Sequence, residues 1–311
     1  MRYSRPIIEV ITQRYSCRTY LDEPIEEEKR HKLSQHAASL TVGPFGTRAR
    51  FQLISASEKD RSALSGLGTY GIIRGATGFL GGAVSAGPKN LEDYGYLLED
   101  LILYATALGL GTCWLGGTFN RSAFAARMRI RPGELMPAVA AVGYVSDKRG
   151  FVDRMMRRGA GASTRLPWEE IFFEGHFGVV LSSEQAGIYA VPLEMLHMAP
   201  SASNKQPWRV IRDGEAWHFF LQRTPGYRQS RLVHIPDLQR TDMGIAMSHF
   251  ELTTKEIGLD GHWTLQEPPL EKPGELVEYT ATWVAATKTL RELPADLTDT
   301  ESTQAFLNAT P

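Results

Sequence analysis

The segment DYGYLLEDLILYATALGLGTCW at residues 93–114 recurs in altered form as DMGIAMSHFELTTKEIGLDGHW at residues 242–263. Both segments have the apolar spacing of an amphipathic helix, end at a Gly-Leu pair and continue into a strand that opens with Trp. The positions that coincide at one constant offset are Gly95 with Gly244, Leu98 with Met247, Leu101 with Phe250, Gly109 with Gly258, Leu110 with Leu259 and Trp114 with Trp263. Because the period is far longer than that of a solenoid, the repeat predicts two related halves with a pseudo-twofold relation rather than an array.

The repeat extends upstream of the two predicted helices. RFQLISA at residues 50–56 corresponds to WRVIRDG at residues 208–214, and each follows a loop that closes a helix. We therefore predict a first half over residues 1–173 and a second half over residues 174–290. Residues 291–311 are polar and weakly patterned, which is typical of a loose tail.

The two halves differ where short polar or cationic side chains gather. The second half contains APSASNKQPW at residues 199–208, whereas the first half has LTVGPFGTRARF at residues 40–51, which lacks the Asn and the Gln. RYSCRTY at residues 14–20 begins the first half and has no counterpart in the second. These complementary losses predict one working site per chain, built from both halves. Drift of a purely structural repeat is the alternative.

Composition narrows the class of protein. The 311 residues are 42% hydrophobic, which is enough for about two domains with real cores. Lys and Arg number 34 against 35 Asp and Glu, so no global field favours nucleic acid or an anionic membrane. Two cysteines and eight histidines without ligand spacing predict neither a disulfide framework nor a metal site, and favour a reducing, cytoplasmic location. The start of the sequence reads as a short amphipathic helix rather than a signal peptide, and no segment has the ~18 apolar residues of a membrane span.

A candidate anion site lies near the start of the chain. Arg14, Ser16 and Arg18 alternate, and in an extended segment alternate residues point to the same side. Two guanidinium groups and a hydroxyl would then converge on a spot of the size of a phosphate. The alternative is that both arginines are solvated or pair with Asp22 and Glu23.

The loop at residues 199–208 is a candidate ligand contact. The spacing of Leu193 and Leu196 predicts a helix that stops near Pro200, and Trp208 begins a predicted strand. Between them lie the polar side chains of Ser201, Ser203, Asn204 and Gln206. They offer donors and acceptors to a flat, hydrogen-bonding ligand. A turn that satisfies only its own backbone is the alternative.

Two further segments are candidates for the same site. WLGGTFN at residues 114–120 places adjacent glycines at the end of a predicted strand, where the backbone can approach a ligand closely; a plain turn is the alternative. An apolar strand over residues 139–149 leads into a basic run that could reach the anion or be a solvated face. That run contains Lys148, Arg149, Arg154, Arg157, Arg158 and Arg165. GLGTYG at residues 66–71 matches GxGxxG but lacks the preceding strand and following helix of a dinucleotide site.

The combination of these motifs resembles the FMN-dependent nitroreductases. The residues that carry the resemblance are Arg-x-Ser-x-Arg at residues 14–18, the Pro-Ser-Ala-Ser-Asn-Lys-Gln-Pro-Trp loop, the Gly-Leu-Gly helix end at residues 109–111 and the Gly-Tyr before the basic run. The tandem arrangement is similar to a nitroreductase subgroup in which the usual homodimer is fused into one chain. The resemblance covers roughly residues 5–285. It implies an α+β fold, a mixed sheet flanked by helices in two tandem halves that form a pseudo-dimer.

The resemblance also implies a site for FMN between the halves. Arg14, Ser16 and Arg18, with Arg165, would hold the phosphate and ribityl chain. The residues that would contact the isoalloxazine and ribityl groups from the second half are Pro200, Ser201, Ser203, Asn204 and Gln206. Those that would lie against the ring from the first half are Leu115, Gly116 and Gly117.

The resemblance further implies an NAD(P)H oxidoreductase that reduces a small-molecule acceptor. Electrons would pass from NADH or NADPH through flavin N5 to nitroaromatic or quinone-like compounds in a ping-pong scheme, with no side-chain acid or base required. A flavin-binding or sensing protein without enzymatic activity is the alternative on the same fold. Since the fused halves supply the interface that relatives obtain by dimerisation, a monomer is expected.

Overall fold

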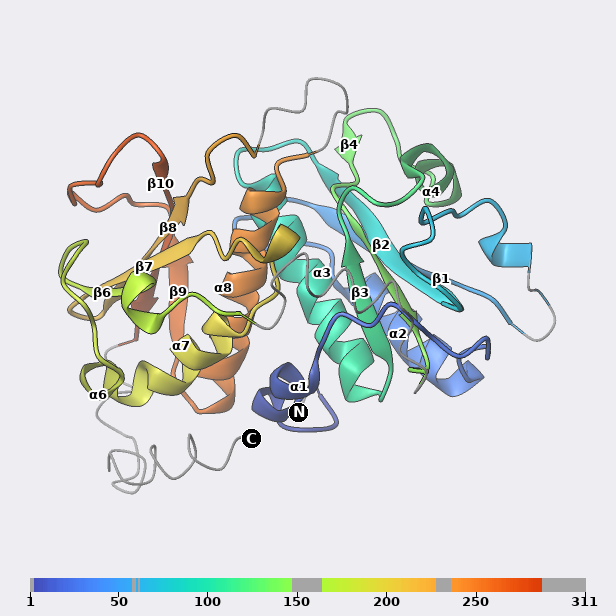
Figure 1. The fold of residues 1–311 in the computed structure, drawn as a ribbon, viewed down its shortest axis with the longest axis horizontal. Helices are drawn as coiled ribbons and strands as arrows, with labels where there is room; N and C mark the ends of the chain where they lie inside the picture. Colours follow the sequence, from blue (N-terminus) through green and yellow to red (C-terminus); the bar gives the residue numbers. More distant parts are fainter. Residues whose placement is uncertain (1–2, 58–59, 61, 147–163, 228–235, 287–311) are drawn as a thin grey trace.

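Two five-stranded sheets enclose a central pair of helices in the computed structural model (Figure 1). The structure describes residues 3–57, 60, 62–146, 164–227 and 236–286. The predicted loose tail at residues 291–311 therefore lies outside the described residues, as do all members of the basic run except Arg165.

The first sheet has the strand order β1-β2-β5-β3, with β4 pairing β2. These strands are β1 (Ala49–Ser55), β2 (Gly78–Ser85), β3 (Gly111–Leu115), β4 (Glu134–Leu135) and β5 (Val139–Gly143). All of the pairs are antiparallel, and β1 runs against β2 from Ala49 opposite Val84 to Ser55 opposite Gly78. The helices of this part are α1 (Ile7–Gln13), α2 (Glu27–Ser39), α3 (Asn90–Ala107) and α4 (Arg121–Arg127).

The second sheet has the order β6-β7-β8-β10-β9. These strands are β6 (Phe172–Glu174), β7 (Trp208–Asp213), β8 (Ala216–Gln222), β9 (Gly261–Thr264) and β10 (Val277–Ala285), and the helices are α6 (Ser183–Ala186), α7 (Ala190–His197) and α8 (Leu238–Glu256). Among the strand pairs of this sheet that the structure describes, β6 and β7 run parallel and the others antiparallel. The architecture is therefore a mixed α+β fold, as expected. The predicted boundary at residue 174 falls inside β6, which pairs with the second sheet.

The order β7-β8-β10-β9 repeats the order β1-β2-β5-β3, and in each case one long helix lies between the second strand and the next. Both long helices end as predicted. Gly109 and Gly258 have φ of 79°, and the amides of Leu110 and Leu259 donate to Ala105 and Thr254. This is the Schellman arrangement that glycine permits at no steric cost. The strands then begin at Gly111 and Gly261, before the Trp of each repeat.

Helices α3 and α8 pack side by side between the two sheets (Figure 1). A side chain at Gly95 would meet the Thr241 carbonyl, and one at Gly244 would meet the Glu92 carbonyl. The two contacts are reciprocal, because each carbonyl lies three residues before the glycine of its own helix. An ion pair joins the helices too, because Arg240 donates two hydrogen bonds to Glu92, at 2.8 and 2.6 Å.

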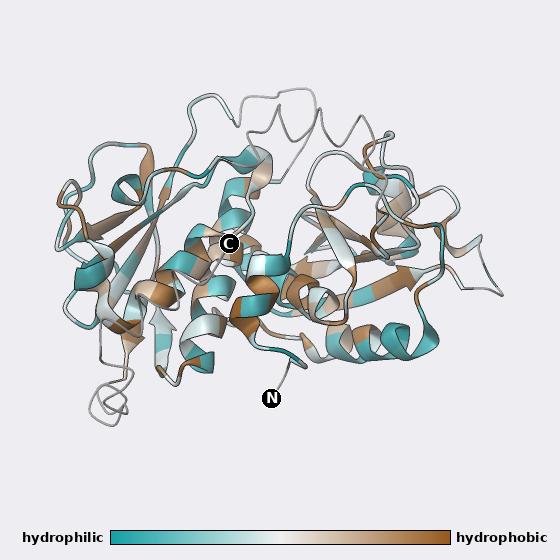
Figure 2. Ribbon diagram, turned by 60° about the horizontal axis from the view of Figure 1, so that its bottom comes forward, coloured by the Kyte–Doolittle hydropathy of each residue, from teal (hydrophilic) through white to brown (hydrophobic). Residues whose placement is uncertain are grey.

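Burial follows this layout. Both long helices are buried nearly all round, and apolar side chains of both sheets contribute to one large core. In Figure 2 brown is concentrated on the strands and the central helices, while the outer helix α2 is mostly teal. Helix α1 joins the two parts, because Ile7, Val10 and Ile11 form one cluster with Leu103 of α3 and Leu252 of α8.

Candidate functional site

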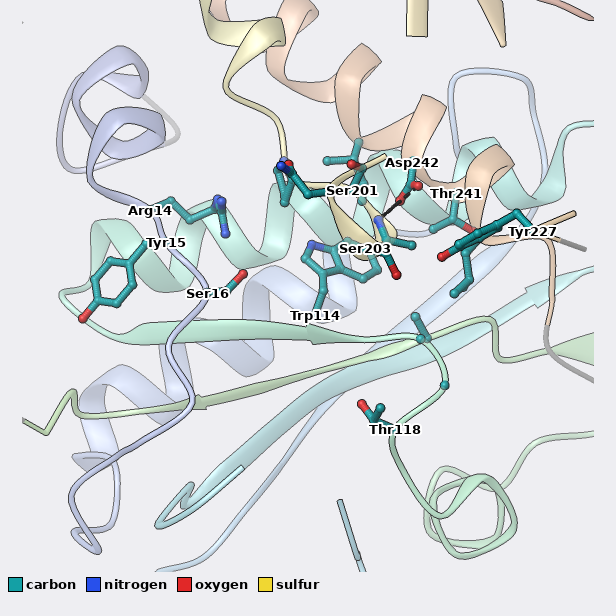
Figure 3. Close-up of a pocket in the computed structure, with 18 of the residues that line it drawn as sticks. Arg14, Tyr15, Ser16, Trp114, Thr118, Ser201, Ser203, Tyr227, Thr241 and Asp242 are labelled. Carbon is teal, nitrogen blue, oxygen red and sulfur yellow. Dashed lines mark hydrogen bonds between the residues drawn. The ribbon is translucent and has the colours of Figure 1, made fainter. Parts of the chain in front are cut away.

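A cavity of about 480 Å³ opens between the two parts of the chain. Its walls come from the segment after α1, the end of β3, the loop after α7 and the first turns of α8. In Figure 3 Arg14 and Ser16 enter from one side and Tyr227 and Thr241 from the other, with Trp114 between them. The volume is that of a small-molecule or cofactor site.

The structure brings ten of the twelve predicted site residues to this cavity. They are Arg14, Ser16, Arg18, Gly116, Gly117, Arg165, Pro200, Ser201, Ser203 and Asn204. The other two, Leu115 and Gln206, are buried at 1% and 3% exposure and are not among its lining residues. Residues from both predicted halves therefore line one cavity.

The segment after α1 lies in extended form beside β3. Ser16 forms a parallel bridge with Thr112, and the Cys17 amide donates to the Thr112 carbonyl at 2.8 Å. Arg14, Ser16 and Arg18 all line the cavity, as does the intervening Tyr15. The carboxylate next to Arg14 belongs to Glu99, 3.8 Å from its Nε, rather than to Asp22 or Glu23.

Positive charge is concentrated at this end of the cavity. The Arg14 side chain is 6% exposed, and its Nε and Nη1 have no hydrogen-bond partner within the described parts of the chain. Arg165 is held by the carbonyls of Ala199 and Met198 at 2.8 and 2.7 Å. Burial, and then the charge of Arg14, lower the pKa of Arg165 to about 10. Cations that are buried together with unmet donors form a site for an anion.

The loop after α7 is strained and internally bonded. Ser203, Asn204 and Gln206 have positive φ of 52°, 53° and 47°, a region that residues other than glycine seldom adopt. Several hydrogen bonds hold this shape. The Gln206 amide donates to Ser201 Oγ at 2.8 Å, and the Ala202 amide donates to both carboxylate oxygens of Asp242 at 3.0 and 3.1 Å.

Gln206 has a different place from the one predicted. Its Oε1 accepts from the Leu166 amide at 3.0 Å, and its Nε2 donates to Thr164 and Asn204 carbonyls. Asn204 also donates to the Thr164 carbonyl, at 2.7 Å. Gln206 therefore lies behind the loop, where it fixes the residues on either side of Arg165.

The end of β3 approaches α8 closely. A side chain on Gly116 would meet Leu238, and the Gly116 carbonyl accepts from Arg121 at 2.8 Å. Leu115 points the other way, into the core on the far face of the first sheet with Phe119 and Phe124. Strand alternation explains why Leu115 does not line the cavity although its neighbours do.

Sequence reasoning missed half of the lining. The further residues are Tyr15, Trp114, Thr118, Ala138, Ala202, Tyr227, Leu238, Thr241, Asp242 and Ile245. One signal was available for Asp242, because the repeat aligns it with Asp93, which accepts from the Phe45 and Thr47 amides at 2.9 Å. Burial, and the charge of Asp237, raise the pKa of Asp242 well above its ordinary value. Thr241 Oγ1 is buried without a hydrogen-bond partner among the residues described.

Comparison with known families gives this site its context. A family profile described as "Putative TM nitroreductase" matches residues 6–254, which is most of the chain. The chain belongs to this family. A search of curated proteins found no match.

One solved structure supports the nitroreductase fold over most of the chain, and two others are similar to about half of it. A nitroreductase from Thermotoga maritima, described as putative, is 20% identical, covers 90% of this chain and 94% of its own, and has a TM-score of 0.54. A nitroreductase family protein from Clostridium difficile 630 is 21% identical and covers 52% of this chain and 94% of its own, with a TM-score of 0.38. A nitroreductase from Desulfovibrio desulfuricans, described as putative, was solved in complex with FMN. It is 23% identical and covers 49% of this chain and 95% of its own, with a TM-score of 0.35.

Over the described ranges, no cluster of three or more His, Cys, Asp or Glu side chains could hold a metal ion. No helix in those ranges has the length and apolar character needed to cross a bilayer.

Proposed function

We propose that this chain is an FMN-dependent NAD(P)H oxidoreductase of the nitroreductase family. The observation that carries the proposal is the cavity itself, which partly buried arginines line together with a Gly-Gly strand end and a polar loop. The unmet Nε and Nη1 of Arg14 fit a phosphate, and the donor-rich loop fits a flat heterocycle. Family membership supports the same cofactor.

The chain's own residues would divide the binding between them. Arg14, Ser16, Arg18 and Arg165 would hold the phosphate and ribityl chain. Pro200, Ser201, Ser203 and Asn204 would contact the ring system, and Gly116 and Gly117 would allow the backbone to lie close to it. We revise two of the expected contacts: Gln206 would act by holding the loop in shape, and Leu115 by packing.

Bound FMN would supply the redox chemistry, a ping-pong transfer of electrons from NADH or NADPH to a nitroaromatic or quinone-like acceptor. The protein would bind both reactants, exclude water and orient them. Tyr227 and Trp114 offer aromatic surface for a planar acceptor. Burial raises the pKa of Tyr227, so its hydroxyl would keep its proton at neutral pH.

We also propose that the two parts are a fused pseudo-dimer with one flavin site, and that the chain is a monomer. The matching strand orders and the reciprocal glycine contacts of α3 and α8 support this view. Light scattering is expected to give the mass of a single chain, 34.6 kDa. A stable dimer at low concentration would contradict it.

Flavin binding tests the function directly. Purified protein incubated with FMN is expected to retain it and to show a flavin spectrum. Arg14→Ala should weaken the binding of FMN at least about tenfold, the scale of one charge-assisted contact. The binding of riboflavin should weaken far less, because riboflavin has no phosphate. Arg212→Ala, at a half-buried pair with Glu174 in the second sheet and outside the cavity lining, is the matched control. Absence of flavin binding would refute the proposal, and FMN that NADH and NADPH cannot reduce would favour a binding or sensing role.

A further inference from the structure

A buried carboxylate lies behind the cationic end of the cavity. Glu99 on α3 is fully buried, and its Oε2 accepts a hydrogen bond from Trp114 Nε1 at 2.6 Å. Its Oε1 lies 3.8 Å from Arg14 Nε. Because Arg14 and Trp114 both line the cavity, one carboxylate contacts a cation and an aromatic ring of the proposed site.

His249 on α8 reaches the same carboxylate from the other half of the chain. It is fully buried, with Nδ1 2.8 Å from the Met195 carbonyl oxygen and Nε2 2.9 Å from Glu99 Oε1. A carbonyl oxygen only accepts, so Nδ1 carries a hydrogen. The contact with Glu99 needs a second proton, on Nε2 or on Oε1. In either arrangement the two side chains together have no net charge.

We propose that His249 is a positioning residue which, by sharing this proton, keeps Glu99 from neutralising Arg14. A bare carboxylate 3.8 Å from the guanidinium, in a site with little water, would cancel its charge and compete with a ligand phosphate. With the proton in place, Arg14 keeps its charge in a cavity that Arg18 and Arg165 also line. The second half would thus set the anion affinity of arginines that belong to the first.

This inference rests on the proposed function, since the anion is taken to be the phosphate of FMN. Its distinguishing consequence is that His249 affects ligands with a phosphate and spares those without one. A merely structural role in the α3–α8 interface would affect both alike.

The test compares FMN with riboflavin on the full chain, by titration of flavin fluorescence. His249→Gln keeps a neutral hydrogen-bond donor to Glu99, but its amide has no proton that it can transfer to the carboxylate. This variant is expected to raise the Kd for FMN about tenfold or more and to leave the Kd for riboflavin unchanged. Glu99→Gln can still accept from Trp114 and donate to His249, and should bind FMN close to the wild-type value. The double variant lacks the carboxylate and should recover FMN affinity.

Recovery in the double variant is the decisive result. Three results would overturn the inference and leave the proposed function standing. The double variant could bind FMN as weakly as His249→Gln, His249→Gln could weaken the binding of FMN and riboflavin equally, or His249→Gln could leave the affinity for FMN unchanged. A wild-type chain that binds neither flavin overturns both. Thermal unfolding of each variant checks its fold. Should His249→Gln not fold, His249→Asn replaces it, because asparagine keeps the donor to the Met195 carbonyl and gives up the contact with Glu99.

Discussion

Replacing Gly244 by alanine tests the close crossing of α3 and α8. In an ordinary helix interior this substitution stabilises by about 0.8–1.0 kcal/mol, because alanine restricts the unfolded chain. Here the added methyl group would overlap the Glu92 carbonyl and approach the Tyr96 amide of the facing helix. Both are backbone atoms in a helix, so neither can rotate away, and the helices must separate.

Gly244→Ala is therefore expected to destabilise the protein, where the same change in an ordinary helix would stabilise it. Overpacking costs about 1–3 kcal/mol, and the rigid neighbours place this site in the upper part of that range. Subtracting the gain in helix propensity leaves a net loss of about 1–2 kcal/mol in the free energy of unfolding. For a chain of this size the midpoint of thermal unfolding should fall by a few degrees, at roughly 2–4 °C per kcal/mol.

Calorimetry or denaturant titration of the full chain measures this change. Gly68→Ala is the matched control, because a methyl group there would meet nothing within 4 Å and its φ is not positive. Gly95→Ala should resemble Gly244→Ala, and the double variant should lose less than their sum, since the first methyl group already separates the helices. Stabilisation by Gly244→Ala would refute the close crossing.

Two further predictions concern stability away from the site. The Arg50 guanidinium, which donates to Glu134 at 3.0 and 2.6 Å, lowers the pKa of that carboxyl from 4.5 to about 2. Because folding lowers this pKa, the ionised pair contributes stability that is complete above pH 4.5 and is lost as the pH falls through about 2. The difference in the free energy of unfolding between wild type and Glu134→Gln should therefore shrink as the pH falls over that window. A difference that stays constant in urea titrations across the window would contradict the pair. Phe250→Ala should lower the free energy of unfolding by about 3–5 kcal/mol, because Phe250 is fully buried among Tyr189, Trp217 and Phe219. A decrease of less than about 1 kcal/mol would contradict that packing.

Much of the fold could be predicted because its signals are local. The period of the apolar residues and the glycine that ends each long helix depend on a few neighbouring residues, and both are visible in the repeat. Alternation along an extended segment placed Arg14, Ser16 and Arg18 on one side before any contact was known. The order of the strands, in contrast, depends on long-range pairing that no single segment encodes.

The sequence by itself determined which residues could form a site: the three arginines, the glycine pair and the polar loop in the two halves. Tertiary structure alone decided how they are used. Gln206 turns behind the loop because the Leu166 amide is within reach, and Thr241 and Asp242 join the cavity because α8 begins beside the end of β3. Tyr227 joins it from the segment after β8. Glu99 and His249 meet only because two glycines let α3 and α8 cross closely. Such contacts join residues far apart in the chain, and their energies depend on burial that appears only when the helices pack.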